Sequence, residues 1–303
     1  MNIKEWGSFG LLGLIWGSSF LWIKIAVAEV GPFTLVALRL FFGLLGLSVI
    51  VLLRRQLIPR ERKILLAFLF LAVFSTALPF VLISWSETQI DSSMAAILNG
   101  TVPLFTIVIA HFWLQDEKIT AQRLGGLMVG FIGVLVLVTR DLDPNFRLLG
   151  TMAGQLAMLA AAASYAFAAT FTRRNLNDQP PLIQAFMVVL LADALLWIIA
   201  PISEAPFQWP SLPITWLALL WLGLLGSCVA YLLFFFLINT WGPTRASLVT
   251  YTFPVVGLIL GAIFLNEVID GRLIFGTALI VGGIGVVNMR ARKSQAVPSA
   301  AQD

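Results

Sequence analysis

The chain has 303 residues, of which 59% are hydrophobic and 11% charged, and its formal net charge is +4 at pH 7. Soluble domains carry roughly 25% charged residues, so this chain cannot cover its own surface with polar groups. The basic residues lie in short loops between apolar runs, which argues against nucleic acid as a partner. The composition predicts an all-α integral membrane protein whose main surroundings are the lipid bilayer.

Side chains that carry chemistry are sparse, and this excludes several functions. Cys228 is the single cysteine and His111 the single histidine, so the chain can form no internal disulfide and no Cys/His zinc site. The sequence shows no glycine-rich phosphate loop and no Ser/His/Asp set. We therefore expect a protein that is not an enzyme, that needs no cofactor or metal, and that does not use ATP to drive transport.

Ten apolar segments follow one another along the chain. A run of about 20 apolar residues can cross a hydrocarbon core of about 30 Å. The first segment is a span rather than a signal peptide, because Lys24 lies too close to the small residues that cleavage would need. Residues 291–303 are polar and are expected to form a disordered cytoplasmic tail. The predicted spans cover residues 7–27, 32–53, 65–85, 92–114, 124–139, 150–171, 181–200, 214–238, 243–265 and 273–289.

The lysines and arginines favour one orientation of these spans. When the N-terminus is placed in the cytoplasm, Arg140, Arg147 and Arg272 are the basic residues of the outer loops, and far more fall in cytoplasmic segments. An even number of spans then returns the C-terminus to the cytoplasm. The sequence predicts a multi-pass protein of a bacterial inner membrane with both termini inside.

Landmarks recur in the two halves of the chain. Residues 1–144 and 145–290 would each contain five spans, and an odd number of spans turns the second repeat upside down in the membrane. We predict ten transmembrane helices in two inverted five-helix repeats; a duplicated protein with a purely structural role is the alternative. The matching pairs are Pro103 with Pro254, Glu117 with Glu267, Gly126 with Gly276, and Gly133 with Gly283.

Taken together, these landmarks resemble a known family. The first span carries Trp16-Gly17-Ser18-Ser19-Phe20 followed by Lys24, the second carries Ala37-Leu38-Arg39, and both halves end in a proline-centred span, an acidic residue and a glycine-rich span. Over residues 7–289 the pattern is similar to the EamA family of the drug/metabolite transporter superfamily, most of all to its bacterial amino-acid exporters. The resemblance implies a ten-helix exporter or permease of small metabolites. Met187 stands where the first half has Arg39, so any role of that arginine is not duplicated.

Polar and aromatic residues within the apolar spans are the candidates for substrate binding. Trp16 lies at about half depth, where its ring can either line a cavity or pack between helices. The serines near it can face a cavity or return hydrogen bonds to the backbone. The predicted substrate-binding residues are Trp16, Ser18, Ser19, Asn99, Thr101, Ser164, Tyr165, Tyr231 and Tyr251.

Three prolines lie inside predicted spans. Proline removes one backbone hydrogen bond and clashes with the preceding turn, so it kinks or unwinds a helix. The backbone groups that are freed can hold the ammonium and carboxylate of an amino acid without a fixed charge. We expect Pro79, Pro103 and Pro254 to form kinks that act in gating; kinks that only shape the packing are the alternative.

Charged residues within spans need a partner or a water-filled pocket. Lys24 lies near the end of its span, where its side chain can extend to the interface. Arg39 and Asp193 lie deeper, and they can pair with one another or bond separately to backbone or water. If Asp193 takes up and releases a proton, it could couple transport to a proton gradient.

These features predict a secondary transporter that exports amino acids, aromatic or other neutral ones among them, or similar small metabolites, by alternating access. Two alternatives stay open. One is a permease of the same fold for another substrate class, such as a nucleotide sugar, a cationic drug or a lipid intermediate. The other is a membrane assembly protein that transports nothing. The expected partners are a small-molecule substrate and the bilayer, and a monomer is compatible with the sequence.

Overall fold

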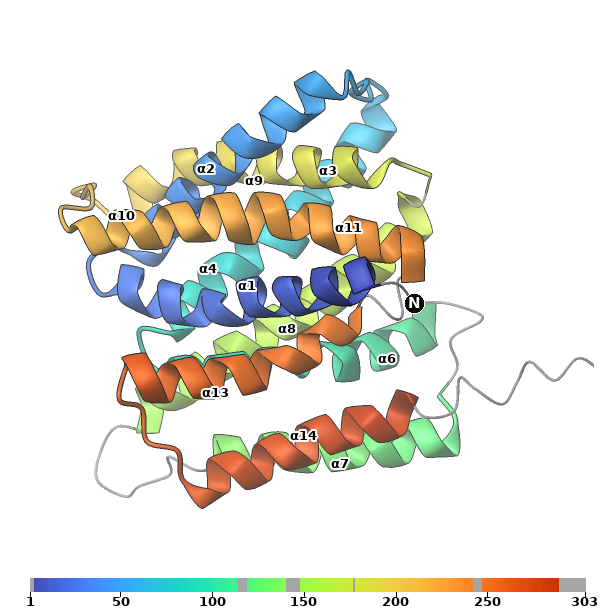
Figure 1. The fold of residues 1–303 in the computed structure, drawn as a ribbon, viewed down its shortest axis with the longest axis vertical. Coiled ribbons are helices and arrows are strands. Elements are labelled where there is room, and N and C mark those ends of the chain that lie inside the picture. The colour runs from blue at the N-terminus through green and yellow to red at the C-terminus, as the bar shows by residue number, and fades with distance from the viewer. Residues whose placement is uncertain (1–2, 114–118, 140–147, 177, 242–246, 289–303) are drawn as a thin grey trace, which may run out of the picture.

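The computed structural model describes residues 3–113, 119–139, 148–176, 178–241 and 247–288, and within these ranges its regular structure is helical throughout (Figure 1). The first half contains α1 (Ile3–Val27), α2 (Pro32–Leu53), α3 (Arg62–Ala72), a π-helical segment (Val73–Ala77), α4 (Leu78–Ser86), α5 (Ser92–Asn99), α6 (Val102–Trp113) and α7 (Ala121–Val138). The second half contains α8 (Leu148–Asn175), α9 (Pro181–Ser203), α10 (Pro213–Leu220), a π-helical segment (Trp221–Val229), α11 (Ala230–Trp241), a 3₁₀ turn (Ser247–Tyr251), α13 (Thr252–Phe264) and α14 (Gly271–Asn288).

Eight helical stretches among the described residues are long and apolar enough to cross a membrane. They correspond to the first eight predicted spans, whose bounds agree within a few residues. The last two apolar helices, Val249–Phe264 and Gly271–Val287, are shorter. The fold is that of a multi-pass helical membrane protein, and the crossing by the last two helices stays a prediction. Glu117, Arg245 and residues 291–303 lie outside the described ranges.

The third span of each half contains a π-helical segment. Val73–Ala77 joins α3 to α4, and Trp221–Val229 joins α10 to α11. A π-helix shifts hydrogen bonds to the residue five positions earlier and so disturbs the regular ladder. Pro79 is in the first turn of α4, directly after the first of these segments. Pro79 therefore lies just after a point where the regular α-helical hydrogen bonding is already interrupted by the π-helical segment.

The fourth span of the first half is two helices rather than one kinked helix. α5 ends at Asn99, Gly100 and Thr101 form a turn, and α6 begins at Val102. Pro103 and Pro254 are the second residue of α6 and the third of α13. A proline in the first helical turn displaces no intrahelical hydrogen bond, because the amides there have no partner in the helix. Pro103 thus follows a turn at Gly100 and Thr101, Pro254 follows directly on a 3₁₀ turn, and a role of these irregular points in gating stays a prediction.

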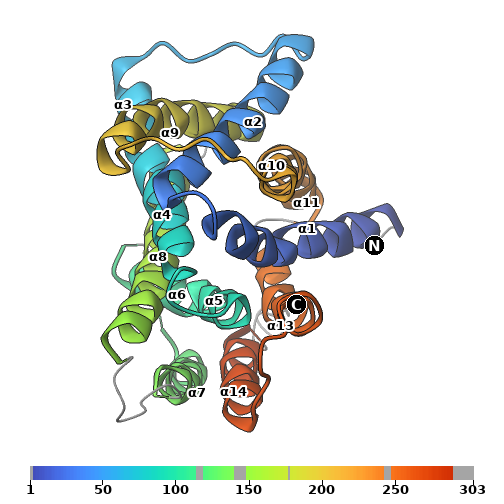
Figure 2. The same ribbon diagram turned by 90° about the vertical axis from the view of Figure 1, so that its left-hand side faces the viewer.

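The helices pack in pairs drawn from opposite halves of the chain. Figures 1 and 2 both place α7 beside α14 at one end of the long axis of the molecule and α2 beside α9 at the other. Between them, α5 packs on α13, α4 on α8, and α1 on α10, α11 and α13. One continuous cluster of buried apolar side chains links these layers. The centre of the molecule is therefore built by residues far apart in sequence.

Glycines set the contact between α7 and α14. A Cβ atom at Gly126 would lie 2.5 Å from the carbonyl oxygen of Gly283, and one at Gly133 would lie 2.8 Å from that of Gly276. Only glycine permits this close approach of two backbones. The van der Waals contacts that result stabilise the helix pair, because lipid supplies no hydrophobic driving force for helix association. Residue numbers rise along one helix as they fall along the other, so the two helices are antiparallel.

Substitution of Gly126 by alanine should destabilise the protein, whereas the same change at Gly125 should not. The new methyl group at Gly126 would overlap the α14 backbone, and overpacking of this kind costs about 1–3 kcal/mol. No neighbour lies within 4 Å of a Cβ at Gly125, so Gly125→Ala should be neutral or gain up to about 1 kcal/mol of helix propensity. Thermal unfolding in detergent compares the two variants. Equal melting temperatures would contradict the tight contact.

Candidate functional site

Trp16 brings three helical segments together near the middle of α1. Its indole N–H donates to the carbonyl oxygen of Gly226 at 3.0 Å, within the second π-helical segment. Its ring contacts those of Tyr231, Phe234 and Phe253, with centroids 6.2, 5.2 and 6.3 Å away. Trp16 therefore compensates the disturbed backbone of another helix and at the same time forms an aromatic wall.

Arg39 lies at the centre of the bundle, 5% exposed, and defines the site around it. Its guanidinium carbon stands 4.0 Å above the ring of Phe80, and its Nε donates to the hydroxyl of Ser227 at 3.3 Å. Tyr165 and Tyr231 lie close enough to interact with it electrostatically. We call Trp16, Arg39, Phe80, Tyr165 and Tyr231 the central cluster. A guanidinium on an aromatic face, with terminal N–H groups to spare, is suited to a carboxylate.

Several predicted binding residues use their hydroxyl groups on the protein itself. Ser18 and Ser19 both donate to the carbonyl of Ile15, at 3.0 and 3.1 Å, and Ser18 also accepts from the indole of Trp221 at 3.2 Å. Thr101 donates to Leu98 in its own turn at 2.6 Å. These contacts match the structural alternative for the serines and give Thr101 the same role.

Ser164 has a comparable role at the first π-helical segment. Its hydroxyl donates to the carbonyl oxygen of Phe74 at 2.6 Å. Asn99 differs, because its Oδ1 is buried and has no hydrogen-bond partner among the described residues. Tyr251 lies half-buried at the end of the 3₁₀ turn, where it packs against the main apolar core.

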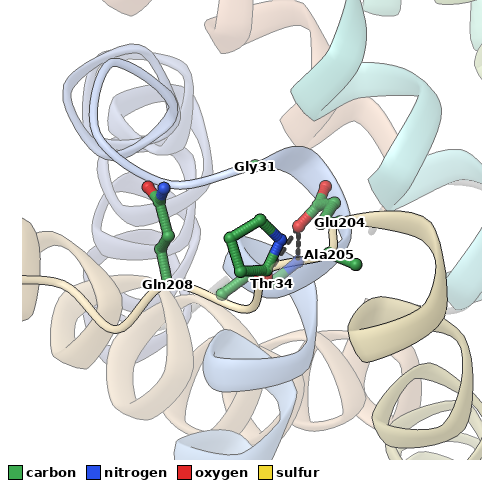
Figure 3. Close-up of a pocket in the computed structure, with 6 residues that line it drawn as sticks. Gly31, Thr34, Glu204, Ala205 and Gln208 are labelled. Carbon is green, nitrogen blue, oxygen red and sulfur yellow. Dashed lines mark hydrogen bonds between the residues drawn. The ribbon is translucent and has the colours of Figure 1, made fainter.

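Carboxylates from remote loops bind the first turns of helices at one end of the bundle, which we call the acidic end. Glu204 accepts from the amides of Phe33 and Thr34 at 2.8 and 2.9 Å and from the Thr34 hydroxyl at 2.6 Å; Figure 3 shows this carboxylate beside the start of α2. Glu267 accepts in the same way from Ser92 and Ser93 at the start of α5. A carboxylate suits a helix N-terminus because the amides there are unpaired and the helix dipole is positive.

Glu29 completes this pattern at the start of α10. Its Oε1 accepts from the hydroxyl and amide of Ser211 and from the amide of Leu212, at 2.6, 2.5 and 3.0 Å. Hydrogen bonds from the side chains of Ser211 and Thr215, followed by those from the backbone of Ser211 and Leu212, lower the pKa of Glu29 to about 2. Three carboxylates thus connect helices from different parts of the chain at the acidic end.

Lys24 binds the loop that follows α4. Its ammonium donates to the carbonyl oxygens of Glu87 and Ile90, at 2.7 and 2.8 Å, and so connects α1 to the loop after α4. The side chain of Glu87 is 0% exposed, and neither carboxylate oxygen has a hydrogen-bond partner in the described part of the chain. Burial raises the pKa of Glu87 well above its usual value and Glu267 adds to this effect, while Lys24 and Arg39 oppose it.

Arg39 and Asp193 do not form the pair that the sequence allowed. Arg39 bonds to Ser227 in the central cluster, whereas Asp193 lines a separate cavity together with Trp197, Trp209 and Trp216. A metal centre finds no support either, since no three His, Cys, Asp or Glu side chains meet within the described ranges.

Sequence inspection missed several residues of these sites. Phe80, Ser227 and Trp221 are ordinary residues of apolar spans, and nothing in their spacing marks them. Signals for the acidic end were available, because Glu29, Glu87 and Glu204 each follow the end of an apolar run. A carboxylate just beyond a span, facing the start of another, is the pattern that could have identified them.

The helical fold with a buried arginine among aromatic side chains defines a polytopic membrane protein with a polar centre, as transporters have. The model of the EamA-like transporter family matches residues 6–139 and again residues 152–289. The chain therefore belongs to the EamA-like transporter family, with two copies of its domain.

Similar proteins cover nearly the whole chain. The uncharacterized transporter YoaV of Bacillus subtilis is 26% identical over 89% of this chain and 92% of its own. The uncharacterized inner membrane transporter YedA of Escherichia coli K12 is 27% identical over 91% and 90%. A probable amino-acid metabolite efflux pump of Salmonella typhimurium is 26% identical over 95% and 96%. A solved crystal structure with 21% identity has the same fold, with a TM-score of 0.70 over 97% of this chain and 100% of its own.

The buried carboxyl of Glu87 should make stability depend on pH. Because its pKa is raised, the folded protein holds the proton more tightly than the unfolded chain. The resulting stabilisation is complete below about pH 4.5 and is lost as the pH rises through the folded-state pKa. Glu87→Gln, a neutral mimic, should therefore melt higher than the parent protein at neutral pH and vary less with pH.

Glu204→Gln serves as the matched control for this experiment. Its carboxylate accepts three hydrogen bonds at the start of α2, so loss of its charge should lower the melting temperature at neutral pH. Melting curves in detergent from pH 4 to pH 9 separate the two effects. A melting temperature of Glu87→Gln that falls below that of the parent protein only at neutral and higher pH would show that Glu87 is needed as an anion.

Proposed function

We propose that this transporter exports amino acids, neutral or aromatic ones first, or similar small metabolites across the bacterial inner membrane. The observation that carries the proposal is Arg39, a buried guanidinium on an aromatic face that forms no salt bridge among the described residues and feels Glu87 only through a longer-range electrostatic interaction. An amino acid supplies that carboxylate. The names of two relatives agree in part, one being a probable amino-acid metabolite efflux pump and the other an uncharacterized inner membrane transporter.

The rings of the central cluster, and Asn99 at the end of α5, suit the other parts of such a substrate. Trp16, Tyr165 and Tyr231 offer rings against which an apolar or aromatic side chain can pack. The unpartnered Oδ1 of Asn99 is an acceptor for an ammonium group. A bidentate contact from Arg39 to the carboxylate would fix the orientation of the substrate. Another organic anion would satisfy Arg39 equally, so the ammonium contact is what distinguishes an amino acid from a nucleotide sugar.

Alternating access between two inverted repeats is the proposed mechanism. The repeats would be residues 1–144 and 145–290, with the tail 291–303 and both termini in the cytoplasm. The packing supports this scheme because the largest contacts have counterparts when the spans of one half are exchanged for those of the other. Span 3 packs on span 6 as span 8 packs on span 1, and spans 2 and 7, 4 and 9, and 5 and 10 pack on each other.

Local contacts support the same relation. Gly126 meets Gly283 and Gly133 meets Gly276, the reciprocal pattern that a two-fold axis produces between repeat-related residues. In the proposed orientation the acidic end faces outward. Release of substrate would then require the contacts of Glu204 and Glu267 with α2 and α5 to separate, which makes them an outer gate.

Counterflow of labelled amino acids into proteoliposomes tests the proposal. Trp16→Ala and Pro103→Ala should each reduce flux strongly, the first through the site and the second through the start of α6. Arg39→Lys keeps the charge but loses the planar pair of donors, so KM should rise about tenfold or more for substrates with a carboxylate. Trp85→Ala, which replaces an exposed tryptophan outside the central cluster, is the control and should transport normally.

Each outcome decides a different part of the proposal. No flux of any amino acid, with flux of a nucleotide sugar or another organic anion instead, would replace the substrate class. Undiminished flux in both Trp16→Ala and Pro103→Ala would overturn the site. No flux of any solute in protein that is folded would favour an assembly role.

A further inference from the structure

A second cavity lies away from the central cluster, between α2, α9 and the start of α10. Its volume is about 590 Å³, within the range of roughly 300–1,000 Å³ found for small-molecule sites. Its lining is almost entirely apolar, and Asp193 is its one charged residue. The lining residues are Leu38, Phe41, Phe42, Leu44, Asp193, Trp197, Trp209 and Trp216.

The aromatic side chains of this cavity form a closed ring, which we call the aromatic cage. Trp197 contacts Phe41 and Trp209, with centroids 6.4 and 6.2 Å away. Trp209 stacks on Trp216 at 6.5 Å with an interplanar angle of 15°, and Trp216 contacts Phe42 at 6.4 Å. Phe42 returns to Phe41 at 5.7 Å and closes the ring.

Asp193 gives the aromatic cage a charge. The residue is 5% exposed, and its Oδ1 has no hydrogen-bond partner among the described residues. A carboxylate within a membrane span is costly unless a cation or donor meets it. Trp197 hydrogen-bonds to the Asp193 side chain, but Arg39 is engaged elsewhere and no lysine or arginine lines the cavity. Among the described residues this carboxylate therefore has a hydrogen-bond donor but no cation.

The position of Asp193 restricts where that positive group comes from. Asp193 precedes the end of α9 at Ser203 by ten residues, about 15 Å along the helix and half of a hydrocarbon core. Phe41 and Trp209 at the rim are exposed, Trp209 by 60%, so the cage opens to the outside of the bundle. A ligand that reaches the carboxylate must enter through apolar surroundings.

We propose that the aromatic cage is a binding site for a hydrophobic organic cation, taken up from the bilayer and distinct from the central cluster. Tryptophan faces attract ammonium groups through the ring quadrupole, and a carboxylate beneath them adds a full opposite charge. The apolar body of the ligand fills the rest of the cavity. A ligand can bind at this site without being transported, so the inference can be tested independently of the proposed export function.

Binding of tritiated (2-naphthylethyl)trimethylammonium to protein in phosphatidylcholine nanodiscs tests this inference. Empty nanodiscs correct for partition into lipid, and the tert-butyl analogue, which has the same shape without charge, serves as the neutral probe. We expect saturable binding of the cation at one site and none of the neutral analogue. Trp16→Ala, which should impair flux, should leave this binding unchanged.

Two substitutions with matched controls locate the site. Asp193→Asn should weaken binding about tenfold to a hundredfold, the usual worth of a charged partner, whereas Asp178→Asn, at an exposed loop acid, should not. Trp197→Leu, which keeps the carboxylate, should weaken binding about three- to thirtyfold, and Trp85→Leu should have no effect.

Three results would overturn the inference. Equal binding of the charged and neutral probes would make the cavity a groove for lipid chains. Unchanged binding in both Asp193→Asn and Trp197→Leu would remove the cage as the site. Loss of binding in Trp16→Ala with intact folding would place the cation in the central cluster.

Discussion

Hydrocarbon offers no hydrogen-bond partner, so every interruption of a membrane helix has to be compensated by the protein itself. The two π-helical segments show how this is done. Ser164 of α8 donates to Phe74 in the first segment, and Trp16 of α1 donates to Gly226 in the second. Free helix ends are treated in the same way, by Glu29, Glu204 and Glu267. Many polar side chains of this protein therefore serve to form hydrogen bonds with its irregular backbone and its helix ends.

This constraint also explains how the bundle is connected. Each compensating group comes from a helix or loop far away in sequence, so a local irregularity creates a long-range contact. The donors at the two π-helical segments occupy the first spans of their respective halves, and the segments occupy the third. The irregular backbone of each π-helical segment costs little free energy while its hydrogen-bond partner stays in place. In the proposed mechanism we expect the helices to bend at these segments, because their backbone hydrogen-bond ladder is already interrupted.

Charged groups inside the bundle form no salt bridges with one another among the described residues, although Lys24 and Arg39 act electrostatically on Glu87. Arg39 lies on Phe80 in the central cluster, Glu87 lies buried at the acidic end, and Asp193 lies in the aromatic cage. A buried pair of opposite charges would satisfy itself and leave little affinity for a ligand. Because they are separated, Arg39 is available to bind the carboxylate of a ligand and Asp193 is available to bind a cation. The two proposed sites are thus opposite in charge and are reached from different surroundings.

Composition and apolar length, by themselves, determined a multi-pass helical protein and the approximate bounds of its spans, and the landmark residues of its two halves indicated its family likeness. These properties follow from local sequence, because hydrocarbon admits only helices of a minimum length. A role of Trp16 and Arg39 in a substrate site stays a prediction. Only the tertiary structure decided that the hydroxyls of Ser18, Ser19, Thr101 and Ser164 bond to the backbone, that Lys24 meets the loop of Glu87, and that Asp193 faces tryptophans instead of Arg39. Each of these depends on which helices are neighbours, and helix pairing in lipid rests on shape and on single polar contacts that leave no period in the sequence.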